Sequence, residues 1–125
     1  MTNKLRISIK ENTALLTIDN PPANTWDLES LNFLEESVKE LNNNKEIFSL
    51  IITGEGEKFF SAGADLSERG ASWKGSKDAL IRGYKPFFKN IIDMPKPVIG
   101  SIAGPAAGIG AAIAMSCDLR IMSDD

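Results

Sequence analysis

Two segments of small residues constrain the fold of this chain more than any other feature. Residues 60–66 read FSAGADL, and residues 103–117 begin with AGPAAGIG. We expect each segment to follow a strand and to precede a helix, so that backbone N–H groups without bulky neighbours lie at the positive end of a helix dipole. Such groups bind anionic oxygens. Two amides from different segments that converge on one oxygen would form an oxyanion hole.

The pattern of apolar residues in the first half of the chain predicts a hairpin, a helix and a buried strand. Residues 5–18 contain two apolar runs around a polar turn, as in an antiparallel hairpin. Asp27 is the expected N-cap of a helix over residues 28–41, in which apolar residues recur every three or four positions. Ser30 stands where a capping box usually has Glu or Gln. Residues 47–53 form a short apolar run, which is typical of a buried strand.

The second half continues this alternation. Its expected elements are a polar loop over residues 67–77, a helix over 77–94 with a kink at Pro86, a strand over 98–103, a helix over 111–116 and a strand over 118–122. Helices that alternate with strands predict an α/β architecture. The chain stops directly after the last expected strand, which we interpret as truncation of a longer domain.

The absence of histidine excludes several kinds of catalysis. With no His among 125 residues, the chain contains neither a Ser-His-Asp nor a Cys-His catalytic group, nor a metal site that uses His. Its single cysteine, Cys117, cannot form an internal disulfide, and we expect a buried residue that packs as a small apolar side chain. Catalysis therefore depends on carboxylates, backbone groups or a cofactor, and we expect no metal.

Charge and hydropathy exclude other classes of partner. The formal net charge is -3, the pI is near 5.0, and Lys and Arg are scattered, so nothing favours nucleic-acid binding. No stretch approaches the roughly 18 apolar residues that a membrane span needs, and the first ten residues do not resemble a signal peptide. We therefore expect a cytoplasmic protein that binds neither nucleic acid nor membranes.

Five segments have a recognisable order and spacing: 20–24, 59–66, 94–99, 102–110 and 117–120. Together they resemble the crotonase superfamily, the enoyl-CoA hydratase/isomerase family. The resemblance implies a crotonase-like α/β fold, the ClpP/crotonase spiral of β-β-α units. It implies that residues 1–125 are the amino-terminal part of a single crotonase-like domain whose carboxyl-terminal part is absent. Intact members of the family assemble as trimers or hexamers.

The resemblance also implies a reaction and a set of backbone sites. Members of the family bind acyl-CoA thioesters and stabilise the enolate that forms when a proton leaves carbon 2. Coenzyme A enters as part of the substrate, so no separate cofactor is expected. The residues that match the two oxyanion donors are Ala62 and Ile109, through their N–H groups, and those that match the CoA-binding groove are Ala23, Ala64, Asp65 and Leu66.

One position departs from the family pattern. Ala112 stands where typical hydratases have a catalytic glutamate, and a second glutamate, on which isomerases of the family often rely, would fall beyond Asp125. Because hydration commonly uses two carboxylates, the loss of one favours isomerisation over efficient hydration. Asp65 is expected to cap a helix or fix the loop, and Asp118 to have a structural role.

Two other interpretations stay open. The first is a non-catalytic acyl-CoA-binding or assembly module that retained the loops and lost the carboxylates. The second is a short-chain dehydrogenase-like NAD(P) site, because Gly104, Gly108 and Gly110 match its glycine pattern and Asp124 could bind a ribose. Spacing disfavours this second interpretation. The acidic residue should follow the glycines by about 20 residues and a full crossover helix, whereas the helix expected at 111–116 has less than two turns.

Overall fold

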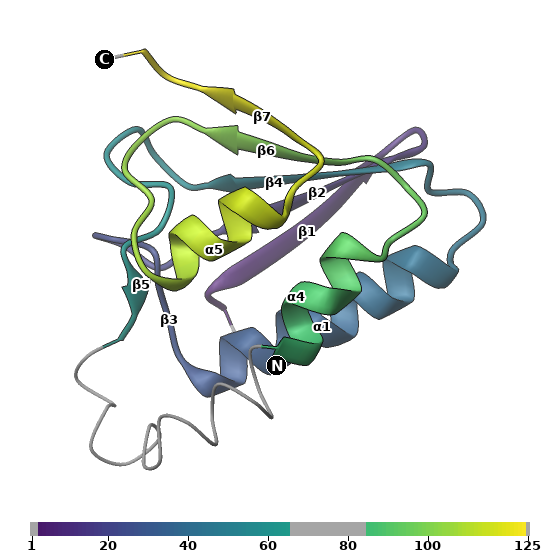
Figure 1. The fold of residues 1–125 in the computed structure, drawn as a ribbon, viewed down its shortest axis with the longest axis horizontal. Helices are drawn as coiled ribbons and strands as arrows, with labels where there is room; N and C mark the ends of the chain where they lie inside the picture. The colour runs from purple at the N-terminus through teal and green to yellow at the C-terminus, as the bar shows by residue number, and fades with distance from the viewer. Residues whose placement is uncertain (1–2, 66–84, 125) are drawn as a thin grey trace.

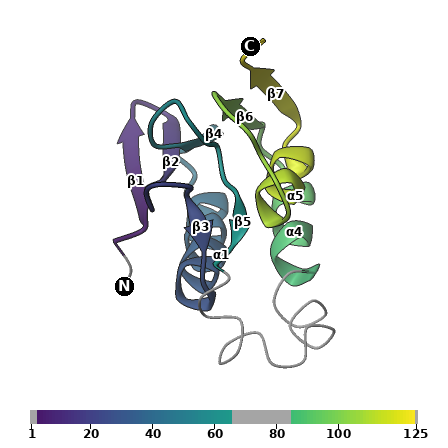
Figure 2. The ribbon, with the colours of Figure 1, turned by 90° about the vertical axis from the view of Figure 1, so that its left-hand side faces the viewer.

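The computed structural model describes residues 3–65 and 85–124. Five strands form one sheet in the order β1-β2-β4-β6-β7, and helices α1, α4 and α5 cover one of its faces (Figure 1). A second sheet, of the short strands β3 and β5, lies next to the start of α5 (Figure 2). The elements are β1 Leu5–Lys10, β2 Thr13–Ile18, β3 Thr25–Trp26, α1 Leu28–Asn43, β4 Ser49–Gly54, β5 Gly63–Ala64, α4 Lys85–Ile92, β6 Val98–Ile102, α5 Ile109–Ser116 and β7 Leu119–Met122.

The large sheet is parallel except at one edge. β1 pairs with β2 antiparallel, which confirms the predicted hairpin, whereas β2–β4, β4–β6 and β6–β7 run parallel. Each parallel pair is joined by a connection that contains a helix on the same face of the sheet, as a crossover connection requires. The predicted hairpin, first helix, last helix and later strands are all present, with shifts of a few residues at their ends.

The core lies between the sheet and its helices. Leu16, Leu50 and Val98 belong to the central strands β2, β4 and β6, and each is fully buried in the core cluster. Leu34 and Val38 lie on the apolar face of α1 and pack into the same cluster. This arrangement follows from the two periodicities in the sequence, because a period of two and a period near 3.6 each produce one apolar face.

The short sheet of β3 and β5 is the main feature that the sequence pattern did not predict. Thr25 and Trp26 pair in parallel with Gly63 and Ala64. Two-residue strands are too short to leave a periodic signal. The expected loop over residues 67–77 and the first part of the helix expected over 77–94 lie outside the described residues. α4 confirms the later part of that helix.

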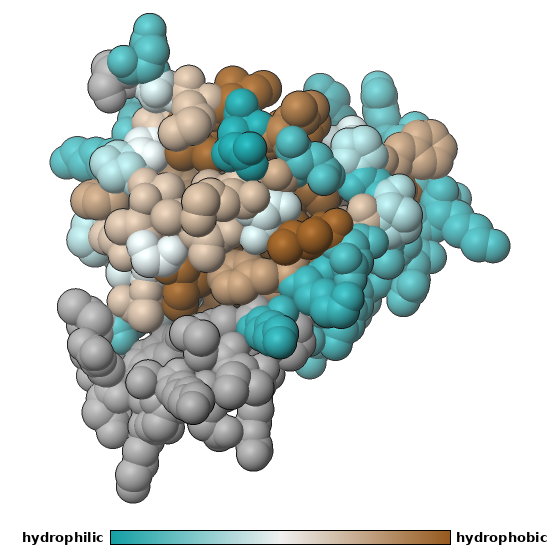
Figure 3. Space-filling view, viewed as in Figure 1, coloured by the Kyte–Doolittle hydropathy of each residue, from teal (hydrophilic) through white to brown (hydrophobic). Residues whose placement is uncertain are grey.

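The edge strand β7 exposes apolar side chains. Leu119 and Ile121 are 62% and 69% exposed, and Met122 is 64% exposed. Figure 3 shows apolar residues at the surface along the upper part of the molecule, where β7 lies. An edge strand also presents unpaired backbone groups, so this side of the sheet is a surface suited to further pairing.

The start of α1 is fixed by a buried capping box. Asp27 accepts a hydrogen bond from the Ser30 N–H at 2.7 Å, and the Ser30 hydroxyl accepts one from the Asp27 N–H at 3.1 Å. The predicted N-cap is confirmed, and a serine closes the box. Burial by itself raises the pKa of Asp27, but hydrogen bonds from Lys4 and Ser30 outweigh it, and the pKa lies below its ordinary value.

We predict that Asp27→Asn destabilises the chain by about 1 kcal/mol at pH 7, because Asn retains the cap and loses the charge that pairs with Lys4 and with the helix dipole. The lowered pKa means that this stabilisation is complete above the ordinary carboxyl pKa and is lost as the pH falls through that value to the folded-state pKa. Urea denaturation at pH 7 and pH 3 measures it. Asp93→Asn, in an exposed pair with Lys89, is the control. An equal deficit at both pH values would contradict the prediction.

Candidate functional site

The two glycine-containing segments lie side by side, as the sequence predicted. The N–H groups of Phe60 and Ser61 donate to the carbonyl oxygen of Pro105 at 3.0 and 3.3 Å, and the Ala107 N–H donates to the carbonyl oxygen of Ser61 at 2.9 Å. Ser61 and Ala106 form a parallel β-bridge. These contacts join segments that are more than 40 residues apart, and they bring the loop before β5 to the start of α5.

Glycine is required at two of these contacts. Gly63 has a φ of +102°, and a Cβ there would lie 3.0 Å from the Ala107 carbonyl oxygen and 3.5 Å from the Ile109 nitrogen. A Cβ on Gly110 would lie 2.3 Å from the Ser61 carbonyl oxygen, which is too close for any side chain. The two backbones approach this closely because neither position carries a side chain.

The N–H group of Ile109 lies at the first position of α5. The first amides of a helix have no acceptor within the helix. Gly108 is the N-cap and provides no side chain that could accept a hydrogen bond, whereas the next amide, that of Gly110, donates to the Ala107 carbonyl at 2.9 Å. The Ile109 amide is therefore at the positive end of the helix dipole and beside Gly63.

The amide of Ala62, the other donor that the family resemblance implies, already donates a hydrogen bond. It donates to the carbonyl oxygen of Ala23 at 2.9 Å, which does not fit the expected role. The Asp65 N–H donates to the Trp26 carbonyl at 2.7 Å, toward β3. Because neighbouring amides of an extended strand point to opposite sides, the Ala64 N–H points away from β3. The geometry thus favours Ala64 over Ala62 as a donor.

The residues that match the CoA-binding groove are only partly described. Ala23 lies against the first segment through its bond with Ala62, and Ala64 and Asp65 lie in or directly after β5. Leu66 lies outside the described residues. The CoA-binding role of these residues stays a prediction.

Ala112, the position that departs from the family pattern, is half-buried in α5 and has no ionisable group. Asp118 accepts a hydrogen bond from the Val98 N–H at 2.8 Å and so links the start of β7 to β6, which confirms its structural role. Within residues 3–65 and 85–124, no group of three or more His, Cys, Asp or Glu side chains could hold a metal ion.

Cys117 is a buried residue without the character of a nucleophile. Its thiol donates to the Ile113 carbonyl at 3.4 Å, and burial raises its pKa to about 11, partly offset by the charge of Arg120. The reactive thiolate is therefore scarce at neutral pH. Arg120 itself donates to the Cys117 carbonyl at 2.9 Å and to two carbonyls at the end of α5, where its charge complements the helix dipole.

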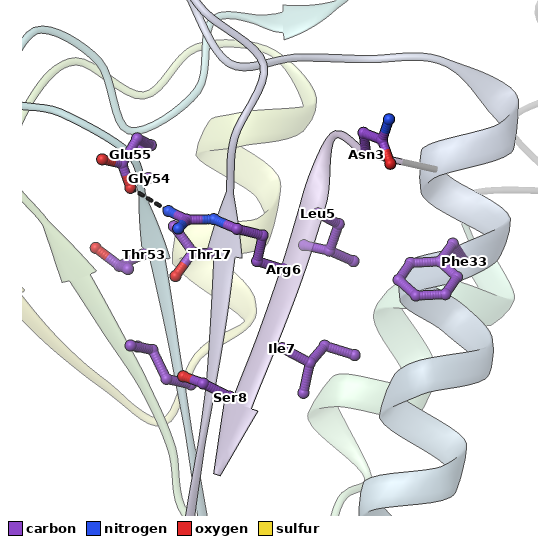
Figure 4. A pocket seen from close by; sticks show the side chains of 11 residues that line it. Asn3, Leu5, Arg6, Ile7, Ser8, Thr17, Phe33, Thr53, Gly54 and Glu55 are labelled. Atoms are coloured by element: carbon purple, nitrogen blue, oxygen red, sulfur yellow. Dashed lines mark hydrogen bonds and ion pairs between the residues drawn. The ribbon is translucent and has the colours of Figure 1, made fainter. Parts of the chain in front are cut away.

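A depression of about 990 Å³ lies elsewhere, around the edge strand β1. Figure 4 shows Leu5 and Ile7 directed toward Phe33 of α1, while Arg6 extends to the other side of the strand and pairs with Glu55. The depression therefore includes both faces of one strand and brings no group of catalytic side chains together.

Comparison with known proteins agrees with the fold and the sequence pattern. Residues 8–125 match the family model for enoyl-CoA hydratase/isomerase. The chain is 38% identical to a probable enoyl-CoA hydratase of Bacillus subtilis, over 98% of the chain and 48% of that protein. It is 36% identical to a short-chain-enoyl-CoA hydratase of Clostridium acetobutylicum, again over 98% of the chain and 48% of that protein.

Solved structures have the same fold. The structure of Pseudomonas aeruginosa DspI matches with a TM-score of 0.89 and 40% identity, over 98% of this chain and 50% of that one. An enoyl-CoA hydratase from Bacillus anthracis matches with a TM-score of 0.88 and 27% identity, over 96% of this chain and 47% of that one.

These matches define an α/β protein of crotonase-like fold in which two backbone segments meet at the start of a helix. The chain belongs to the enoyl-CoA hydratase/isomerase family. It spans about half the length of the curated relatives that it matches, so the crotonase-like fold is truncated here. None of the helices in the described part of the chain is both long and apolar enough to cross a membrane.

We predict that Gly110→Ala lowers the free energy of unfolding by about 3 kcal/mol, because the new methyl group would overlap the Ser61 carbonyl and separate the two segments. Gly56→Ala is the control. Unlike Gly110, Gly56 has a positive φ, +80°, but a Cβ there meets open space, so only a backbone cost of about 1 kcal/mol is expected. Urea denaturation of both variants gives the comparison. Equal losses would show that the close contact at Gly110 does not limit stability.

Proposed function

We propose that this chain forms part of an acyl-CoA-binding enzyme of the enoyl-CoA hydratase/isomerase family. This enzyme would stabilise a thioester enolate in a backbone oxyanion hole. The observation that supports this proposal best is the approach of Gly63 to the Ile109 amide: a Cβ added at Gly63 would lie 3.5 Å from the Ile109 nitrogen. It places the first amide of α5, which has no acceptor within the helix, next to the other small-residue segment. Two preorganised donors at such a point stabilise the charge that develops on a thioester oxygen.

The donors in this proposal are the amides of Ile109 and Ala64. Ala62, the donor taken from the family resemblance, is set aside because its N–H is bonded to Ala23. Main-chain donors suit an enolate because they are neutral, fixed in position and reinforced at Ile109 by the dipole of α5. Ala23, Asp65 and Leu66 keep their proposed place in the CoA-binding groove. Coenzyme A belongs to the substrate, and no separate cofactor is required.

The reaction class that we favour is isomerisation of an enoyl-CoA over efficient hydration. Ala112 has no ionisable group, so the α5 helix provides no second carboxylate to activate water. The proton-transfer group would then belong to a part of the whole protein outside residues 1–125. We propose that the whole protein is a cytoplasmic homo-trimer or hexamer that acts in fatty acid metabolism.

A non-catalytic acyl-CoA-binding or assembly module remains the second candidate. Ala112 is the observation that favours it, because binding requires the loops and not the carboxylate. The NAD(P)-binding alternative is not retained, since the family match includes the glycine-rich segment on which it depended.

We predict that Ile109→Pro weakens binding of a CoA thioester about tenfold, the value of one hydrogen bond to the thioester oxygen. Proline is tolerated at the first position of a helix, so the change removes the N–H without breaking α5. Titration calorimetry should compare acetoacetyl-CoA with a thioether analogue of CoA that has no carbonyl oxygen. Ile109→Ala, which keeps the amide, is the control.

The thioether should bind equally well to both variants, and circular dichroism should show that both are folded. If wild type binds the thioester no better than the thioether, or if Ile109→Pro retains the wild-type preference, the oxyanion role of Ile109 is wrong.

For the whole protein, we expect conversion of a 3-enoyl-CoA to proceed faster than hydration of a 2-enoyl-CoA, because of Ala112. Steady-state assays of both substrates with the complete gene product measure the ratio. Hydration that greatly exceeds isomerisation would overturn the preference. No activity with either substrate, together with retained binding, would favour the non-catalytic module.

A further inference from the structure

Two buried polar side chains, Asn24 and Ser61, lie where the loop segments meet. Asn24 is 1% exposed and Ser61 is fully buried. A buried polar group without a hydrogen-bond partner would be costly, so the partners of these two side chains indicate what the surrounding backbone requires.

Asn24 joins the segment before β3 to the turn after β4. Its side-chain amide donates to the carbonyl oxygens of Glu55 at 3.1 Å and Phe59 at 3.0 Å, and its side-chain oxygen accepts from the Asn20 N–H at 3.1 Å. Its backbone has a φ of +51°, a conformation that Asn tolerates better than most residues. Asn24 therefore fixes both the entry to β3 and the approach of the first glycine-containing segment.

Ser61 contacts three segments of backbone. Its hydroxyl donates to the Asn24 carbonyl oxygen at 2.7 Å and accepts from the Gly63 N–H at 3.3 Å. Its own backbone groups bond to Pro105 and Ala107 in the second segment. Ser61 thus connects the segment before β3, the segment before β5 and the segment that leads into α5.

We propose that Asn24 and Ser61 are positioning residues that hold Gly63 and Ala64 against Ile109. The Ser61 hydroxyl bonds the Gly63 amide, and the Ser61 backbone bonds the segment that leads into α5, so a movement of Ser61 changes the separation of the two donors. Both side chains are buried, so their proposed role is to hold backbone in place and not to touch a ligand. The geometric part of the proposal stands by itself, and its consequence for ligand binding rests on the proposed oxyanion hole.

The Ser61 hydroxyl is important because an oxyanion hole is sensitive to the positions of its donor amides. Displacement of a catalytic contact by about 1 Å can cost on the order of 10²-fold in rate. Removal of the Ser61 hydroxyl leaves both the Gly63 N–H and the Asn24 carbonyl without this partner inside a packed region. The loop must then shift or admit water, and either change alters the approach to Ile109.

The chain contains a matched control for this substitution. Ser37 is also buried, at 3% exposure, and its hydroxyl also donates to a backbone carbonyl, that of Phe33, at 2.7 Å. This bond lies within α1, away from both glycine-containing segments. Ser61→Ala and Ser37→Ala therefore each remove one buried hydroxyl-to-carbonyl hydrogen bond, but only the first lies at the proposed site.

The first measurement needs no ligand. A Cβ position on Gly63 lies 3.5 Å from the Ile109 nitrogen, so a nuclear Overhauser effect between a Gly63 Hα and the Ile109 amide proton is expected in the isotopically labelled wild-type chain. Ser61→Ala should weaken this effect at least twofold, and Ser37→Ala should leave it unchanged. An unchanged effect in folded Ser61→Ala would overturn the positioning role.

The second measurement is the ratio of affinities for acetoacetyl-CoA and for the thioether analogue of CoA. Ser61→Ala should lower this ratio about tenfold, and Ser37→Ala should leave it within about twofold of wild type. Equal ratios for both variants would contradict the proposal. Asn24→Gly, which accepts the positive φ and removes the three side-chain bonds, should act in the same direction as Ser61→Ala.

If Ser61→Ala does not fold, Ser61→Cys provides the test, because a thiol is a weaker donor than a hydroxyl and should give a smaller change in both measurements. A thiol variant with the full wild-type ratio and nuclear Overhauser effect would count against the proposal. A wild-type chain that does not distinguish thioester from thioether would refute the proposed oxyanion hole, and the ligand-free measurement would still decide the positioning role.

Discussion

The contact between the Ser61 backbone and the segment that leads into α5 is the constraint on which the rest of this structure depends. The Ser61 carbonyl oxygen accepts a hydrogen bond from the Ala107 N–H, and the Ser61 N–H donates one to the Pro105 carbonyl oxygen. A Cβ added at Gly110 would lie only 2.3 Å from the Ser61 carbonyl oxygen. Any side chain at Gly110 would push α5 away from the β5 segment. The position of the helix start, and with it the Ile109 amide, therefore follows from the absence of an atom at one residue.

The proposed oxyanion hole depends little on charged side chains. The described chain has no histidine, no metal-binding cluster and no carboxylate at Ala112. What it brings together is a set of backbone dipoles at a helix start, held by buried hydrogen bonds from Asn24 and Ser61. Such a set can stabilise developing negative charge but cannot transfer a proton. In the proposed function, binding and charge stabilisation are therefore separated in the sequence from acid/base chemistry.

The exposed apolar side chains of the edge strand β7 are consistent with the greater length of the matched proteins. The chain covers about half of each matched protein, and β7 ends the sheet with exposed Leu119 and Ile121. An exposed apolar edge strand favours association with other polypeptide. By contrast, the covered face of the sheet has a closed core around Leu50 and Val98, so the amino-terminal part of the fold has its own apolar cluster.

The sequence by itself determined the local elements, because their signals are periodic or chemical and act over a few residues. The alternation in β1 and β2, the apolar face of α1 and the cap at Asp27 all appear where the pattern indicated them. The glycine-containing segments were also visible, since small residues next to an expected helix start expose backbone N–H groups, whereas the choice of the Ile109 amide came from the resemblance to the family.

Only the tertiary structure decided which amides are available. Ala62 and Ala64 are indistinguishable as alanines on either side of a glycine, yet one bonds to Ala23 and the other points away from β3. The two-residue strands and the three-segment role of Ser61 were likewise invisible in the sequence. Apart from the local bond between Ser61 and Gly63, these features depend on hydrogen bonds between residues 37 or more apart, and a partner at that distance leaves no trace in local composition or period. The physical reason is that the direction of a backbone N–H in a strand depends on which neighbouring strand it pairs with, and that pairing exists only in the folded chain.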